Sequence, residues 1–270
     1  MTAQTHVTYL MESAAEAARL EGKTDDAVSH QQLILTGLGS GMRALDAGCG
    51  TGAVARVMAK IVGPDGSVVA ADASAERVEV GRALAKQARI DNLEFVQADL
   101  RAVPVKRESF DYVWSRFLFE YLADPDVVLR QLVDATVLGG KVVVGDLDNN
   151  SLIHYPISES AAAGLAKMID ALQGQFDPLA GRKLYNRFQR QGLVNIRTHV
   201  LPYHVYAGVA PEADMANWTA KFVTLRAVGV RAFGSGQDYE RWVAEFLAHL
   251  RDPAVFTYST LIIVEGTRAR

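Results

Sequence analysis

The chain has 270 residues with a formal net charge of −3 at pH 7, and 49% of them are hydrophobic, which suffices for an α/β domain with a substantial core. Charged residues are interspersed, which gives no basic surface for nucleic acid, and no apolar run approaches the roughly 20 residues of a membrane span. Cys49 is the only cysteine, and the N-terminus is unlike a signal peptide, so we expect a cytoplasmic protein without nucleic-acid or membrane partners.

The first 40 residues predict two helices. One covers residues 8–22, which combine good helix formers with a terminal glycine, and the other covers 25–41, which start with two aspartates and end among glycines. These helices precede residues 41–270, which we expect to form a single domain.

Strand and helix patterns alternate from there on. Short, nearly apolar strands separated by amphipathic helices predict a parallel sheet covered on both faces, which is the doubly wound, Rossmann-like α/β fold. The expected strands are 42–48, 67–74, 93–100, 110–115 and 141–148, and the expected helices are 53–62, 75–88 and 125–137.

The last third of the chain has a different pattern. Two long strands, 194–206 and 256–266, have no helix directly after them, and we expect helical insertions at about 151–192 and 208–252. Because Pro202 cannot donate a ladder hydrogen bond, the first of these strands should lie at a sheet edge.

A glycine-rich loop follows the first strand, in "LDAGCGTG". Gly48, Gly50 and Gly52 lack a Cβ, so a ligand can lie against the main chain ahead of the next helix. The spacing G-x-G-x-G differs from the G-x-G-x-x-G of dinucleotide-binding proteins. Asp46, two residues before the first glycine, repels phosphate and suits a cation. The loop therefore favours S-adenosylmethionine, which has an ammonium group and no phosphate, over NAD.

The same stretch resembles motif I of the class I S-adenosylmethionine-dependent methyltransferases. The resemblance implies a seven-stranded sheet whose last strand lies antiparallel beside strand five, with the sixth strand outermost. It also implies S-adenosylmethionine as cofactor, S-adenosylhomocysteine as product, and an oxygen, nitrogen or carbon atom as methyl acceptor. The Asn/Asp-Pro-Pro-aromatic motif of enzymes that methylate DNA or amide nitrogens is absent after strand four, so the expected acceptor is a small molecule.

Acidic residues follow the second and third strands, as an adenosine ligand requires. Asp72 stands some twenty residues beyond the glycines and is expected to bind the ribose hydroxyls, with Ala73 against the adenine. Asp99 is expected at the adenine amino group, and the backbone N–H of Leu100 at a ring nitrogen.

Strand four ends in "WSRF". The backbone near Ser115 is expected to contact the methionine part of the cofactor. Arg116 has two interpretations: it binds a carboxylate, either of the cofactor or of an acidic substrate, or it is a structural ion-pair partner.

Candidate catalytic and substrate-binding residues lie in the variable regions. His154 is a candidate base, and Tyr121 occupies a place where related small-molecule enzymes often carry a pocket histidine; a purely structural role is open for both. The candidate substrate-binding residues are Asn149, His154, Tyr155, Tyr203 and His204. Strict alternation predicts that Tyr203 and His204 face opposite sides of their strand. The six histidines are scattered, so we expect no metal site.

The N-terminal stretch "YLMESAAEAARL" resembles the lid helix of small-molecule methyltransferases of the ubiquinone/menaquinone-biosynthesis type and their natural-product relatives. The resemblance implies that residues 1–40 form a helical lid in which Tyr9 covers the sulfonium. A homodimer is compatible with such a lid. Aromatic residues in the insertions indicate a partly aromatic or hydrophobic acceptor, or simply form the core of the insertions. Two other functions stay open: a methyltransferase-like protein that binds the cofactor without catalysis, and a nicotinamide-dependent oxidoreductase.

Overall fold

The sheet determines the architecture. The computed structural model describes residues 21, 24–102 and 107–269, with only the backbone described at positions 102, 151 and 152. Within these residues a seven-stranded sheet has the order β3-β2-β1-β4-β5-β7-β6. The strands are β1 (Arg43–Ala47), β2 (Ser67–Asp72), β3 (Leu93–Gln97), β4 (Phe110–Arg116), β5 (Thr136–Tyr155), β6 (Val194–Ala207) and β7 (Phe256–Thr267).

Helices cover both faces of this sheet, as apolar parallel strands require. One core cluster joins the sheet to α2, α3 and α4, and a second joins its other face to α5 and α7. The helices are α2 (Asp26–Leu35), α3 (Ala53–Val62), α4 (Ala75–Gln87), α5 (Pro125–Ala135), α6 (Glu159–Ala171), α7 (Ala180–Arg190), α8 (Glu212–Thr224), α9 (Arg226–Phe233) and α10 (Gly236–His249). Two short 3₁₀ helices are η1 (Leu100–Ala102) and η2 (Phe119–Tyr121). None of these helices is long and apolar enough to cross a membrane.

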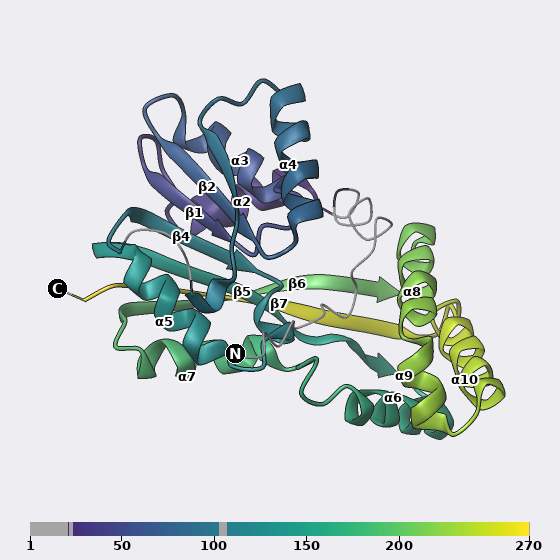
Figure 1. Cartoon of the computed structure of the whole chain (residues 1–270). Helices are drawn as coiled ribbons and strands as arrows, with labels where there is room; N and C mark the ends of the chain where they lie inside the picture. The colour runs from purple at the N-terminus through teal and green to yellow at the C-terminus, as the bar shows by residue number, and fades with distance from the viewer. Residues whose placement is uncertain (1–20, 22–23, 103–106, 270) are drawn as a thin grey trace, which may run out of the picture.

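Three long strands carry a separate group of helices. β5, β6 and β7 run out from the parallel part of the sheet toward α6, α8, α9 and α10 (Figure 1). These four helices enclose their own aromatic core, which includes Trp218, Phe222, Trp242 and Phe246. Of the insertion aromatics, Trp218 and Phe222 therefore form the core of the insertion, whereas Tyr155 and Tyr185 are exposed.

The predicted fold class is confirmed. β7 is antiparallel to β5 and to β6, and β6 lies at the sheet edge with Pro202 in it, as the sequence predicts. Strand five is longer than the predicted 141–148, because pairing with β7 resumes at Ile153 after an irregularity and continues to Tyr155. The predicted helix 8–22 lies outside the described residues, apart from Glu21.

One prediction about β6 is wrong. A register shift between Pro202 and Val205 interrupts the pairing with β7, so side chains no longer alternate there. Tyr203 and His204 therefore lie on the same side, with ring centroids 4.5 Å apart.

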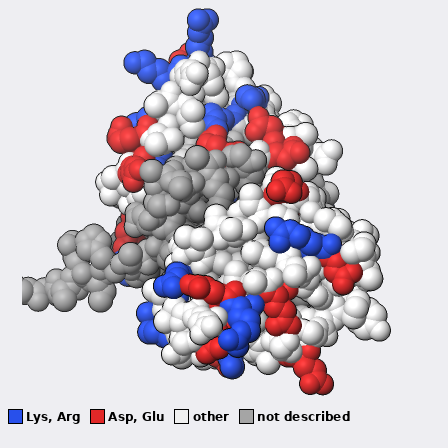
Figure 2. Space-filling model, turned by 90° about the vertical axis from the view of Figure 1, so that its right-hand side faces the viewer, with Lys and Arg blue, Asp and Glu red and all other residues white. Residues whose placement is uncertain are grey.

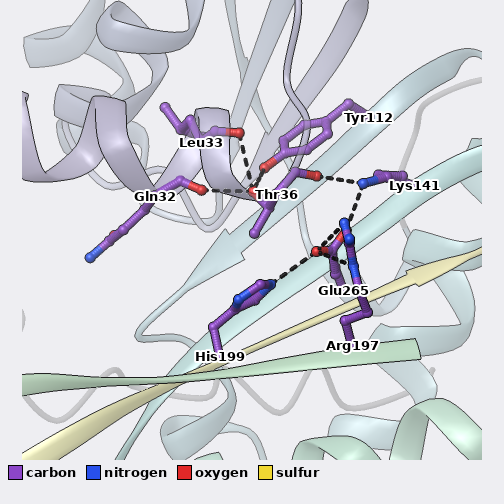
Figure 3. A network of polar contacts seen from close by, with 8 residues as sticks. All are labelled: Gln32, Leu33, Thr36, Tyr112, Lys141, Arg197, His199 and Glu265. Carbon is purple, nitrogen blue, oxygen red and sulfur yellow. Dashed lines mark hydrogen bonds and ion pairs between the residues drawn. The ribbon is translucent and has the colours of Figure 1, made fainter. Parts of the chain in front are cut away.

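A buried carboxylate joins α2 to the late strands. Glu265 accepts hydrogen bonds from Lys141 Nζ (2.6 Å) and Arg197 Nε (3.0 Å) and lies 2.9 Å from His199 Nε2 (Figure 3). Lys141 also donates to the carbonyl oxygen of Thr36, the C-cap of α2. Burial raises the pKa of Glu265, but the hydrogen bonds from Lys141, His199 and Arg197 together lower it by more than burial raises it. The net shift of the pKa is therefore downward. Lys141 lies where pairing of β5 with β4 resumes after a register shift, at the edge opposite the glycine loop, so the network supports the fold rather than a ligand.

Gly52 illustrates how tightly α3 packs. Its φ is +78°, and a Cβ there would lie 2.4 Å from the Phe95 ring. We expect Gly52→Ala to lower the free energy of unfolding by about 3 kcal/mol, measured by urea denaturation, because backbone strain and overpacking add. Gly139→Ala is the matched control, since its φ is +81° but nothing lies within 4 Å, and should lose only about 1 kcal/mol. Equal losses would show that Phe95 is not the constraint.

Candidate cofactor and acceptor site

The candidate site lies at the carboxyl ends of the parallel strands. β1 is in the middle of the parallel part, between β2 and β4, and chain order reverses there. Such a switch point leaves a crevice between neighbouring loops, where open α/β sheets bind their ligands. The carboxyl ends of β1, β2 and β4, and the segments that directly follow β1, β2 and β3, carry all the predicted cofactor residues except Tyr9.

The glycine loop is held by main-chain hydrogen bonds. Gly48 N and Cys49 N both donate to the carbonyl oxygen of Ala71 in β2, at 2.8 and 3.0 Å. Gly48 and Gly50 have φ values of +78° and +57°, which favour glycine. Gly52, by contrast, is required because a Cβ there would collide with the Phe95 ring, and not because a ligand needs the space.

Asp72 connects two loops of the site. Its Oδ2 accepts from Gly50 N at 2.8 Å, and its Oδ1 accepts from Ser74 N at 3.0 Å. Each carboxylate oxygen has a second acceptor position, so both remain able to accept from ribose hydroxyls. Ala73 is exposed directly beside it, as a residue that contacts the base should be.

Asp46 is a buried carboxyl group at the end of β1. It is 3% exposed, and among the described residues its Oδ2 has no hydrogen-bond partner. Burial raises the pKa of Asp46 to about 7 against the opposing effect of Arg116, and the Asp72 carboxylate adds to the rise. A buried acceptor without a donor is costly, so this atom indicates a place for a hydrogen-bond donor or cation of a ligand.

Arg116 lies on the neighbouring strand β4 and points to the same face as Asp46. Its Nη1 donates to Gln32 Oε1 at 2.8 Å, and its guanidinium lies 5.0 Å from the centroid of the Phe117 ring. Burial lowers the pKa of Arg116, and Tyr203 and Asp46 partly counteract this. Phe117 has a φ of +58°, a strained conformation for an aromatic residue that occurs mostly at functional sites.

Asp99 reaches the same edge of the sheet but is already paired. Arg101, which the sequence did not single out, donates from Nε to Oδ1 at 3.0 Å and from Nη2 to Oδ2 at 2.6 Å. These hydrogen bonds lower the pKa of Asp99. Both side chains are about half exposed, so the ion pair is weak and a ligand can take the place of Arg101 at Asp99. Leu100 is buried beside them.

Two predicted residues near the end of β4 remain, Ser115 in the strand and Tyr121 in η2. Ser115 is fully buried, and among the described residues its Oγ has no hydrogen-bond partner. Tyr121 ends η2 and packs against Phe176, with ring centroids 5.5 Å apart.

Tyr203 and His204 continue the site along β6. The Tyr203 ring lies edge-on to Phe117 at 5.2 Å, which places it next to the Arg116 side chain. His204 is buried, and its Nδ1 shares a 2.7 Å hydrogen bond with Ser259 Oγ. The structure thus brings two of the predicted substrate-binding residues together beside the end of β4.

The other predicted substrate-binding residues lie further out on β5. His154 is buried, shares a 2.7 Å hydrogen bond with Thr257 Oγ1 and lies 5.2 Å from the His249 ring of α10. Tyr155 is 79% exposed, and Asn149 donates its backbone N–H to Pro178. His154 and His204 thus both hydrogen-bond to β7, at Thr257 and Ser259, whereas Tyr155 is exposed. Among the described residues, no cluster of three His, Cys, Asp or Glu side chains is arranged for a metal.

Sequence reasoning missed two further groups. Asp146 of β5 is buried and accepts from Leu147 N (2.9 Å) and Glu120 N (3.1 Å); burial and the Glu120 carboxylate raise its pKa well above the usual range.

The second group is Ser29 and Gln32 of α2, which approach Arg116. The only sequence signal for them was a pair of polar residues on a face of the helix that also carries Leu33.

Comparison with known proteins identifies the family. A model described as a methyltransferase domain matches residues 38–192, more than half of the chain. The chain belongs to this family of methyltransferase domains. Its cofactor is S-adenosylmethionine, and the oxidoreductase alternative is not favoured.

The relatives of this methyltransferase domain agree with that assignment. The ubiquinone/menaquinone biosynthesis C-methyltransferase UbiE of Pseudomonas putida is 32% identical over 153 residues, which cover 56% of this chain and 56% of the relative. A SAM-dependent methyltransferase from Aquifex aeolicus has a TM-score of 0.55 at 14% identity, over 94% of this chain and 99% of that one. Haemonchus contortus phosphoethanolamine N-methyltransferase 2, in complex with phosphomonomethylethanolamine and S-adenosylhomocysteine, has a TM-score of 0.58 at 18% identity. That match covers 90% of this chain and 53% of the other. At these identities the two structures show the fold alone.

The residues of the site fit this cofactor. The unsatisfied Oδ2 of Asp46 suits an ammonium group, the positive-φ glycines leave bare main chain, and Asp72 retains acceptor capacity for hydroxyls. When bound, S-adenosylmethionine supplies an electrophilic methyl group whose transfer needs no metal.

The buried Asp46 predicts a pH-dependent stability of the ligand-free protein. Its folded pKa of about 7 lies above the usual 3.8, so the folded state holds more protons between these values. The free energy of unfolding should therefore fall as pH rises from about 4 to 7, by at most about 4 kcal/mol from this group. Asp46→Asn should remove the share of this group and leave the decline that the raised pKa of Asp146 causes, so the variant should decline less than the wild type in urea unfolding at pH 5 and pH 8.

Asp111→Asn is the control, because the pKa of Asp111 is shifted in the opposite direction. Arg43 lowers the pKa of Asp111, so removing this carboxyl group should leave the decline in stability between pH 5 and 8 in place. A wild-type protein equally stable at both pH values, or an Asp46→Asn variant with the wild-type decline, would contradict the assignment.

Proposed function

We propose that this protein transfers the methyl group of S-adenosylmethionine to a small-molecule acceptor, leaving S-adenosylhomocysteine. The observation that carries the proposal is the buried Asp46 carboxyl group, whose Oδ2 has no partner among the described residues, beside a positive-φ glycine loop in a methyltransferase domain. The chain spans 56% of the length of the UbiE relatives, so C-methylation of a quinone precursor is one acceptor class among several to test.

The proposed cofactor position follows from the loops. Asp46 and the loop of Gly48 and Gly50 hold the methionine portion together with the backbone at Ser115, while Asp72 binds the ribose. Ala73, Asp99 and Leu100 surround the adenine, and Tyr9, which lies outside the described residues, remains the proposed cover of the sulfonium.

The proposed acceptor position lies between the end of β4 and the insertion helices. Phe117, Tyr203 and His204 offer two aromatic rings and one imidazole in contact, which suits a partly aromatic molecule. Helices α6, α8, α9 and α10 then act as a cap of the methyltransferase domain. Basic and acidic side chains are mixed on the face of Figure 2, so that face has no continuous basic surface for a polyanion.

Two further parts of the proposal rest on the sequence. We infer a cytoplasmic location from the single cysteine, and a homodimer remains compatible with the proposed N-terminal lid.

The proposal is tested by binding and turnover together. We expect calorimetry to show binding of S-adenosylmethionine and S-adenosylhomocysteine, and mass spectrometry to show a gain of one CH₂ in an acceptor from a panel of phenols, quinols, amines and enols. Binding without turnover across the panel would instead favour a non-catalytic cofactor-binding protein, and absence of binding would overturn the proposal.

The proton acceptor is tested with three variants. We add His204, predicted only as a substrate-binding residue, as a third candidate, because it lies in the proposed acceptor site and its Nδ1 is hydrogen-bonded to Ser259. His204→Asn should then lower kcat by about 100-fold or more and leave the Kd for S-adenosylhomocysteine unchanged. His154→Asn and Tyr121→Phe test the other two candidates. A wild-type kcat in His204→Asn with a loss in either of the others would assign the proton transfer to that residue instead.

A further inference from the structure

Helix α2 has an unusual distribution of side chains. Ser29 and Gln32 are 1% and 5% exposed, whereas Val28, Ile34 and Leu35 are each nearly half exposed. An ordinary surface helix buries its apolar side. Burying two polar side chains beside Leu33 is unfavourable unless they have polar partners inside.

The inward partner is Arg116. Gln32 Oε1 accepts from Arg116 Nη1 at 2.8 Å, and Ser29 Oγ lies 3.5 Å from the same nitrogen. Both are neutral acceptors. Within the part of the chain that the structure describes, no carboxylate forms an ion pair with this partly buried guanidinium. A partly buried guanidinium that donates only to neutral groups retains donors for an anion.

The place of Arg116 indicates which anion that is. Asp46 in β1 pairs with Trp114 in β4, and Arg116 is two residues further along the same face. An acidic and a basic side chain therefore stand on neighbouring strands, as the ammonium and carboxylate of one α-amino acid would require.

We propose that Gln32 is a positioning residue for cofactor binding: it holds the Arg116 guanidinium so that Arg116 binds the α-carboxylate of S-adenosylmethionine. The inference rests on the proposed function and deepens it, because it makes α2 part of the cofactor site. Loading the carboxylate then stabilises the packing of α2 on the sheet.

The test compares S-adenosylmethionine with its decarboxylated analogue, which keeps the sulfonium and the ammonium and lacks only the carboxylate. Calorimetry should give the full-length wild type at least about 10-fold higher affinity for S-adenosylmethionine, the range of a charge-assisted hydrogen bond. Gln32→Leu should weaken S-adenosylmethionine about 10-fold and leave the analogue within about 2-fold. In an Arg116→Met background, Gln32→Leu should add no further loss, because its effect passes through Arg116.

Leu33→Ala is the control for a merely structural role. Leu33 is buried in α2 but is not among the groups that Arg116 donates to, so its loss should lower Tm and weaken both ligands equally. Hydrogen exchange gives an independent measurement: S-adenosylmethionine should slow amide exchange in α2 of the wild type more than the analogue does.

The outcomes separate the two proposals. If the wild type binds neither ligand, the proposed function fails. If it binds both equally, or if Gln32→Leu weakens both by the same factor, the cofactor site stands and the role of Gln32 and Arg116 is overturned.

Discussion

The site depends on two oppositely charged side chains on adjacent strands, the buried Asp46 and the partly buried Arg116, which do not form an ion pair with each other. Burial pushes the pKa of each toward its neutral form, which is the signature of charge held away from water. A fold retains such an arrangement only where something else repays the desolvation. The ammonium and carboxylate of an α-amino acid would satisfy both side chains at once.

The rest of the molecule positions this pair. Parallel pairing of β1 with β2 and β4 brings Asp46, Asp72 and the glycine loop to one edge, and α3 approaches closely because Gly52 leaves room for Phe95. Asp72 fixes the loop through Gly50. At the opposite edge, the Glu265 network holds α2 and the late strands in register, so the ligand-binding edge need not provide that stability.

Local sequence signals place the residues of the proposed cofactor site more directly than those of the proposed acceptor site. Glycine spacing and acids after strands are local signals, and the parallel sheet turns them into neighbours, so Asp46, Asp72 and the fold class follow directly. The side of β6 on which His204 lies depends on a register shift, which strict alternation does not reveal. Gln32 and Arg101 matter only through tertiary contacts, and polar residues on a helix ordinarily predict its solvent face.

Proton exchange on binding tests the central claim most directly. A ligand ammonium beside Asp46 should lower the pKa of that carboxyl group from about 7, so binding at pH 7 must release protons. Calorimetry of S-adenosylhomocysteine binding in buffers with different ionisation enthalpies should show release of about half a proton per site by the wild type and much less by Asp46→Asn. Equal proton exchange by the two proteins, or none by either, would contradict the account.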